Sequence, residues 1–311
     1  MNATPVSITA EELPPPVSPL QRQWRRFHKN KGAVAGLWII AALLVACLAT
    51  IPLTQSRYAT TDLVGGRRPP DRNAIFGTDV LGRSVAVRCM LGGVISLTVG
   101  FSAAAIAMVL GVAWGTAAAM AGGRIDALMM RMVDILFGLP YILLVILLKV
   151  GLDGLLHDRL GLSAQSANIV ILLAAIGGVS WLTMARVIRG QVLSLQTRPF
   201  IEAARALGLP RTRIFFSHLL PNLMGPLIVY ASLTVPQAIL QESFLSFLGI
   251  GIQPPMPSWG NLAAEGVTAI NPVQSFWWQL LFPCGLLSLT LLCLNFIGDG
   301  LRDAFDPSAA D

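Results

Sequence analysis

Long apolar segments alternate with short polar ones along most of this 311-residue chain. Apolar runs of roughly 18 residues or more with few charges predict membrane-spanning helices. We expect six of them, over residues 32–53, 92–121, 132–150, 168–185, 223–250 and 276–298. Pro140 interrupts the third run, and Pro226 and Pro236 fall inside the fifth. The pattern therefore predicts an all-α polytopic membrane protein.

Residues 194–222 separate the fourth apolar run from the fifth and read as a helix, a stop and a second helix. Pro199 suits a first helical turn, where its missing N–H costs nothing. Gly208 is typical of the position just past a helix end, and Pro210 follows it. A second short helix is expected from Arg211 to about residue 220, ending before Pro221.

The first helix of this segment has one apolar face and several charges. Its apolar residues recur at the spacing of a single helical face: Phe200, Ala203, Ala204 and Leu207. Glu202 and Arg205 lie off that stripe, three positions apart, where they can pair. Basic residues, including Arg198, place the segment outside the bilayer. A short helix with two adjacent alanines on its exposed stripe is suited to docking into a groove on a partner protein.

The composition excludes a soluble protein and an ATPase. Hydrophobic residues make up 54% of the chain and charged residues 12%, more apolar surface than a soluble core of ordinary size can hide. None of the three lysines, Lys29, Lys31 and Lys149, stands in a P-loop motif. We therefore expect no cofactor in this chain, and any ATP and Mg²⁺ to be bound by partner subunits. The scattered histidines and cysteines predict no metal site.

The distribution of basic residues predicts the orientation. Fourteen of the 22 lysines and arginines lie on the side of the N-terminus, the helical hairpin and the C-terminus, which predicts that these face the cytoplasm. Six arginines in the first external loop are the exception. Residues 21–31 form a basic amphipathic segment expected to lie on the inner membrane surface. A cleaved secretory signal is the alternative for the N-terminal region, but the leader is long and several more apolar runs follow.

The expected organisation has four parts: a cytoplasmic N-terminal tail over residues 1–31, the first transmembrane helix and external loop over 32–91, a core over 92–303 that contains the hairpin 194–222, and a cytoplasmic tail over 304–311. Polar residues late in the fifth run, Gln237, Gln241 and Glu242, are candidates for a pore or gate. For Glu242, an interfacial or helix-paired carboxylate is the equal alternative. Asp134 is expected to pair with Arg131.

The hairpin resembles the EAA loop of bacterial ABC-importer permeases. The resemblance rests on Glu202-Ala203-Ala204, Gly208 and Leu220-Pro221 at the family's spacing, with His218 where isoleucine is common. Further segments, at residues 76–84, 129–140, 242–251 and 296–307, resemble the C-type permease subunit of oligopeptide and dipeptide importers, nearer the oligopeptide branch. Ser84 departs from this pattern, which has aspartate there.

The resemblance implies a type I importer permease fold and a half-channel in the bacterial inner membrane. Its implied partners are a homologous second permease, two cytoplasmic ATPase subunits, an extracytoplasmic binding protein and a peptide substrate. It also implies that the EAA loop couples the chain to the ATPases, through residues that we name as Arg198, Phe200, Glu202, Ala203, Ala204, Arg205, Leu207, Gly208 and Pro221.

Two other functional classes compete with this interpretation. A secondary transporter also uses helices broken by proline, but it gives no reason for a partner-docking hairpin. A membrane-embedded hydrolase lacks its usual motifs here. Within the ABC importers, nickel, glutathione and muropeptide systems use similar subunits, so the cargo stays open.

Overall fold

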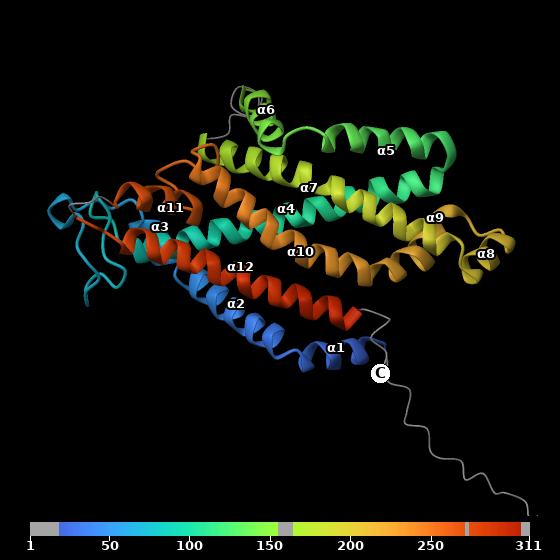
Figure 1. The fold of residues 1–311 in the computed structure, drawn as a ribbon, viewed down its shortest axis with the longest axis horizontal. Helices are drawn as coiled ribbons and strands as arrows, with labels where there is room; N and C mark the ends of the chain where they lie inside the picture. Colours follow the sequence, from blue (N-terminus) through green and yellow to red (C-terminus); the bar gives the residue numbers. More distant parts are fainter. Residues whose placement is uncertain (1–18, 155–163, 271–273, 306–311) are drawn as a thin grey trace, which may run out of the picture.

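A computed structural model describes residues 19–154, 164–270 and 274–305. Figure 1 shows an elongated bundle of helices, with no β-strand among the residues described. The predicted tails lie largely outside the described residues. The elements are, in order, α1 (Pro19–Lys29), α2 (Lys31–Ala49), α3 (Ile51–Arg57), η1 (Leu63–Gly65), α4 (Val85–Ala121), α5 (Gly123–Phe137), α6 (Tyr141–Gly154), α7 (Ala164–Gln196), α8 (Pro199–Ala206), α9 (Arg211–Ile214), η3 (Phe215–Leu219), α10 (Leu220–Phe247), α11 (Trp259–Thr268) and α12 (Trp278–Phe305).

Five continuous helices in the described residues are long and apolar enough to cross a membrane. They are α2, α4, most of α7, the run 211–247 that ends in α10, and α12. The helices α4 and α7 extend beyond the predicted apolar runs. Hydropathy marks only the apolar part of a helix and not its polar ends. A sixth crossing exists only if the bent pair α5 and α6 counts as one span.

The third predicted span is not a continuous helix. The helices α5 and α6 meet at an angle of 95°. Pro140 explains the break, since proline has no N–H to donate and keeps the preceding Leu139 out of the helical region. The first span is also shorter than predicted: α2 ends at Ala49, and α3 begins afresh with Pro52 in its first turn.

The centre of the bundle is α4, which packs against α7, α10, α11, α2 and α12. Two glycines of α4 bring α7 close. A Cβ atom at Gly111 would overlap the side chain of Met184, and one at Gly115 would overlap the backbone at Ala185. This Gly-x-x-x-Gly pair allows the two helices to pack closely.

Most of the basic segment predicted at 21–31 lies in helix α1, which ends at Lys29. The Asn30 side chain accepts a hydrogen bond from the backbone N–H of Ala33 (3.1 Å) and begins α2. Helix α1 packs against α12. In Figure 1, α1 and the C-terminal end of α12 lie toward the same end of the bundle as α8.

At the opposite end, residues 58–84 and α11 cap the bundle. A cluster of charges joins them. Arg88, which is 1% exposed, donates to Asp79 (2.8 Å) and to Oε1 of Glu265 (2.8 Å), and Arg83 donates to Asp79 (2.6 Å). The loop after α10 ends at Ser258, whose side chain caps α11.

Candidate functional site

The hairpin begins with α8, whose ends follow from its sequence. Arg198 has an extended backbone and Pro199 occupies the first helical turn. The helix ends at Ala206, and Gly208 has a φ of +74°, a backbone conformation that favours glycine. The predicted start and stop of this helix are therefore observed.

The faces of α8 differ in part from the predicted stripe. Ile201 and Ala204 are buried (0% and 4% exposed), whereas Phe200 and Leu207 are exposed (42% and 81%) together with Ala203. The exposed apolar stripe thus holds one of the two alanines and not both. Ala204 turns inward because it shares a face with Ile201, three positions earlier.

Glu202 and Arg205 are exposed and form no ion pair with one another within the described chain. The expected pair is therefore absent, and both charges lie free on the surface beside the apolar stripe.

The second helix of the hairpin does not end before Pro221. Helix α9 passes through the π-helical turn η3 into α10, so that residues 211–247 form one continuous run. Pro221 lies in the first turn of α10. Proline has no N–H to donate to the preceding turn. It is tolerated here because the π turn before it already departs from the regular α-helical hydrogen-bond pattern. Ile214, Phe215 and Leu219 point inward and pack in one apolar cluster.

The hairpin is tied to the bundle by polar contacts around the ends of α4 and α7. Arg189 of α7 pairs with Asp126 of α5 (Nη2 to Oδ2, 2.6 Å). Gln196 donates to the carbonyl of Ala119 (3.3 Å), and Arg211 donates to that of Met120 (3.3 Å). The last two contacts connect the residues before and after α8 to the C-terminal end of α4.

Asp134 has a different partner from the one predicted. It accepts a hydrogen bond from Arg186 of α7 (2.8 Å) rather than pairing with Arg131, and the Arg186 guanidinium also lies over the ring of Phe137. Arg131 is close in sequence, but the fold brings α7 alongside α5.

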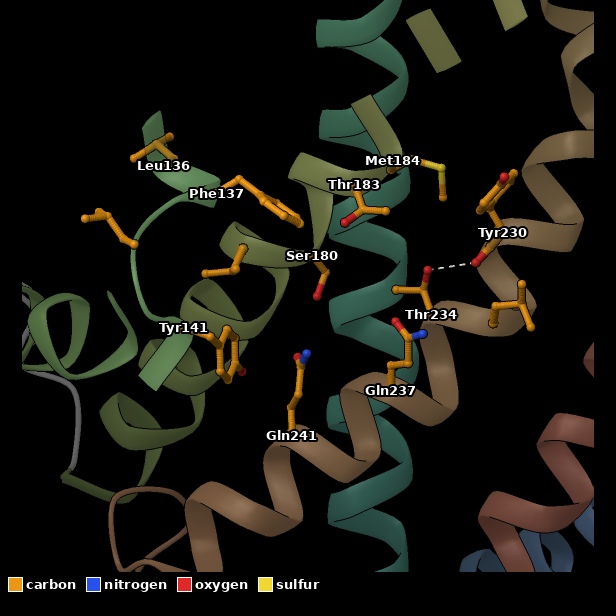
Figure 2. Close-up of a pocket in the computed structure, with 13 residues that line it drawn as sticks. Leu136, Phe137, Tyr141, Ser180, Thr183, Met184, Tyr230, Thr234, Gln237 and Gln241 are labelled. Carbon is orange, nitrogen blue, oxygen red and sulfur yellow. Dashed lines mark hydrogen bonds between the residues drawn. The ribbon is translucent and has the colours of Figure 1, made fainter. Parts of the chain in front are cut away.

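A cavity of about 460 Å³ opens between the α5–α6 break, α7 and α10. Figure 2 shows side chains from these helices around it. The lining carries hydroxyl and amide groups but no charged residue: Leu136, Phe137, Leu139, Tyr141, Val179, Ser180, Thr183, Met184, Tyr230, Leu233, Thr234, Gln237 and Gln241.

Two of the three predicted pore residues line this cavity. Gln237 and Gln241 point from α10 toward it. Glu242 is absent from the lining and is completely buried, with its carboxylate against α4. Sequence reasoning missed Tyr141, Ser180 and Thr234, because a single polar residue in an apolar run carries no sign of which helix face it occupies.

The carboxylate of Glu242 is held by serines. Ser96 of α4 donates to Oε2 (2.8 Å), and Ser246 donates to Oε1 (2.7 Å). The Ser246 hydroxyl also accepts from the backbone of Ile252 (2.9 Å). This network joins α4, α10 and the loop after α10, a geometry that corresponds to the helix-paired alternative.

One apolar cluster connects the hairpin to the cavity. Ile201 and Ala204 of α8 belong to it together with Met184 of α7, and Tyr230 of α10 packs against it. Met184 and Tyr230 also line the cavity. One packed apolar cluster therefore extends from α8 to the cavity wall.

The described residues contain no group of three or more His, Cys, Asp or Glu side chains arranged to hold a metal ion. The geometry instead consists of a protruding helix, a packed connection and an uncharged cavity.

Comparison with known proteins identifies the family. Residues 107–311 match the model of the binding-protein-dependent transport system inner membrane component. This chain belongs to that family. Residues 18–70 match the N-terminal transmembrane domain of oligopeptide transport permease C.

Relatives in this family match over most of the chain. The dipeptide transport system permease protein DppC of Bacillus subtilis (strain 168) is 44% identical over 94% of this chain and 87% of its own length. The oligopeptide transport system permease protein OppC of Escherichia coli (strain K12) is 44% identical over 91% of this chain and 89% of its own. The two identities are equal, so they do not separate the two peptide classes.

Among solved structures, the chain resembles the inward-facing MetNI methionine ABC transporter, with a TM-score of 0.53 and 21% identity over 69% of this chain and 94% of that one. This likeness shows the fold, a type I ABC importer permease. The chain is thus a multi-pass inner-membrane transport subunit. The apolar pattern predicts its multi-pass character, and the family resemblance implies the rest.

Proposed function

We propose that this chain is one of two permease subunits of an ATP-driven peptide importer. The observation that carries the proposal is the single apolar cluster that contains Ile201 of α8 and Met184 at the cavity wall. The relatives named as peptide permeases supply the cargo class. Peptides longer than two residues are the preferred cargo, supported by the match of residues 18–70 to an oligopeptide permease domain.

The partners follow from the surfaces of the chain. The exposed Phe200, Ala203 and Leu207 form a stripe for a cytoplasmic ATPase subunit, which binds ATP and Mg²⁺. A second permease faces the α5–α6 break. Irregular backbone at membrane depth is tolerated only where protein or an aqueous cavity covers it, and residues 137–140 are exposed in this chain. An extracytoplasmic binding protein delivers the peptide.

The proposed orientation has α8, α1 and the C-terminal end of α12 in the cytoplasm. The arginine-rich loop 58–84 and the start of α4 were the exception to the distribution of basic residues. Two of these arginines, Arg83 and Arg88, are paired with Asp79 and Glu265. Their charge is neutralised within the fold, which supports an external position.

The mechanism is mechanical. Closure of the ATPase dimer displaces α8, and the cluster around Ile201 and Met184 transmits this displacement to α7 and α10. The two helices then tilt, and the cavity between them opens toward the outside. Nothing in this sequence of events requires bond-making chemistry from the permease itself.

The test is reconstitution. The chain is co-expressed with its candidate second permease and ATPase subunits, and the purified assembly is placed in vesicles with the binding protein. We expect ATP-dependent uptake of tri- to pentapeptides, with less uptake of dipeptides. Uptake of nickel or glutathione in place of peptides would reassign the cargo. Transport by the isolated chain, driven by an ion gradient, would overturn the proposal in favour of a secondary transporter.

A further inference from the structure

Two residues of the cavity lining each carry a buried polar atom that the fold leaves without a partner. Five buried side-chain atoms in the described part of the chain have no hydrogen-bond partner, and two of them line this one cavity: the hydroxyl of Tyr141 and Oε1 of Gln241. A buried polar group without a partner costs free energy, so each such group calls for an explanation.

The two residues lie on opposite walls. Tyr141 is the first residue of α6, directly after the break, and Gln241 lies on α10. Figure 2 shows both side chains directed into the space between these helices. Their positions depend on the break at Pro140, which turns the start of α6 toward α10.

Two of the neighbouring hydroxyls are already engaged. Ser180 donates its hydrogen to the carbonyl of Ile176 (2.8 Å), and Thr234 donates to that of Tyr230 (2.7 Å). Their hydrogens satisfy their own helices, whereas the Tyr141 hydroxyl and the Gln241 carbonyl remain available to an occupant of the cavity.

The lining also restricts the chemistry of the occupant. It has no charged residue, so it offers no counter-charge to a terminal ammonium or carboxylate group. Its buried polar atoms without a partner are one hydroxyl donor, on Tyr141, and one amide acceptor, on Gln241. A peptide main chain presents the complementary pair, a carbonyl and an N–H, at each residue.

We propose that Tyr141 and Gln241 hold the main chain of the peptide in transit: the Tyr141 hydroxyl donates to a peptide carbonyl, and Oε1 of Gln241 accepts from a peptide N–H. The inference rests on the proposed function and deepens it. Recognition of the main chain alone accepts peptides whatever their side chains are. Binding of the peptide main chain is favoured because it gives hydrogen-bond partners to two buried groups that otherwise have none.

The first test removes each group. Tyr141→Phe and Gln241→Leu are compared in the reconstituted assembly with Thr290→Val, which removes another buried hydroxyl without a partner, on α12 and outside the cavity. We expect uptake at sub-saturating peptide to fall about two- to tenfold for the cavity variants, the usual effect of one neutral hydrogen bond. Uptake by Thr290→Val stays at the wild-type level.

The thermal midpoint of the assembly separates binding from folding. Removal of a hydroxyl that has no partner does not destabilise the fold, so Tyr141→Phe keeps or raises the midpoint while it lowers uptake. Reduced recovery of the second permease with Tyr141→Phe would overturn the inference, because the hydroxyl would then bind that subunit rather than the peptide.

The second test uses a tripeptide with one N-methylated amide, which lacks an N–H. The wild-type assembly takes up this analogue more slowly than the parent peptide. We expect Gln241→Leu to reduce the ratio of parent uptake to analogue uptake, while Thr290→Val leaves this ratio unchanged. The binding protein is the same in every sample, so its own preference cancels.

An unchanged ratio together with wild-type uptake in both cavity variants would overturn the inference and leave the proposed function intact. If the wild-type assembly takes up no peptide of any length, the proposed function fails, and the inference fails with it.

Discussion

Gly208 shows how one backbone position controls the shape of the hairpin. Its φ of +74° ends α8, and no atom lies within 4 Å of the place where a Cβ would stand. Substitution therefore meets backbone strain and not steric overlap.

We expect Gly208→Val to cost about 1–2 kcal/mol locally and to lower peptide uptake while ATP hydrolysis continues. Asparagine adopts this conformation more readily than other residues, so Gly208→Asn should retain most uptake. Measurement of uptake per ATP hydrolysed in vesicles distinguishes the two variants. Equal uptake in both would contradict a role for the bend in coupling.

Glu242 is a buried carboxylate whose hydrogen bonds come from hydroxyl groups of Ser96, Ser243 and Ser246. Glu242→Gln keeps one acceptor oxygen, and its Nε2 group can donate to the serine hydroxyl on the other side, so uptake should stay unchanged. Glu242→Leu removes the acceptor and should destabilise the protein by about 2 kcal/mol. Thermal unfolding in detergent, alongside uptake, tests both variants. Loss of uptake in Glu242→Gln at unchanged stability would restore the gate role for this residue.

At the scale of elements, the contact between α4 and α7 depends on the absence of side chains. Gly115→Ala would place a methyl group against the backbone of Ala185 and Arg189, at a cost of about 1–3 kcal/mol. The control is Gly285→Ala on α12, where nothing lies within 4 Å. It should stabilise the helix by about 0.5–1 kcal/mol. The same change thus has opposite signs at the two sites, and thermal midpoints that move in the same direction would contradict the packing.

Helix α8 has two apolar faces with different expected roles, inward through Ile201 and outward through Leu207. Ile201→Ala leaves a void beneath α8, which destabilises by about 2–5 kcal/mol. This variant should bind the ATPase but transport less per ATP. Leu207→Ala should weaken ATPase binding instead. Co-purification of the ATPase with each variant, measured together with uptake, tests the division. Equal loss of ATPase in both variants would argue against separate roles.

For the molecule as a whole, the orientation gives a direct prediction. The native cysteines are buried or half-buried in helices, so a membrane-impermeant thiol reagent should leave the wild-type chain unlabelled. We expect Arg72→Cys to be labelled in intact cells, and Arg205→Cys only after the membrane is permeabilised. The reverse pattern would show the opposite orientation in the membrane and would contradict the coupling role of α8.

Local sequence was enough to predict the helical class, the apolar runs and the two ends of α8. These features depend on near neighbours: a proline without an N–H, a glycine that adopts a positive φ, and apolar residues that must avoid water. The motif at Glu202-Ala203-Ala204 with Gly208 likewise lies within one short segment, which is why the family could be identified from it.

Contacts between distant segments could not be read in the same way. The sharp turn at Pro140, the partners of Asp134 and Arg88, the inward face of Ala204 and the cavity around Tyr141 and Gln241 all depend on how α5, α7, α10 and α11 pack. Most faces of the membrane-spanning helices are hydrophobic, so hydropathy does not distinguish the faces that meet lipid from those that meet protein. Only the packed helices decide which polar groups find partners and which remain open to a substrate.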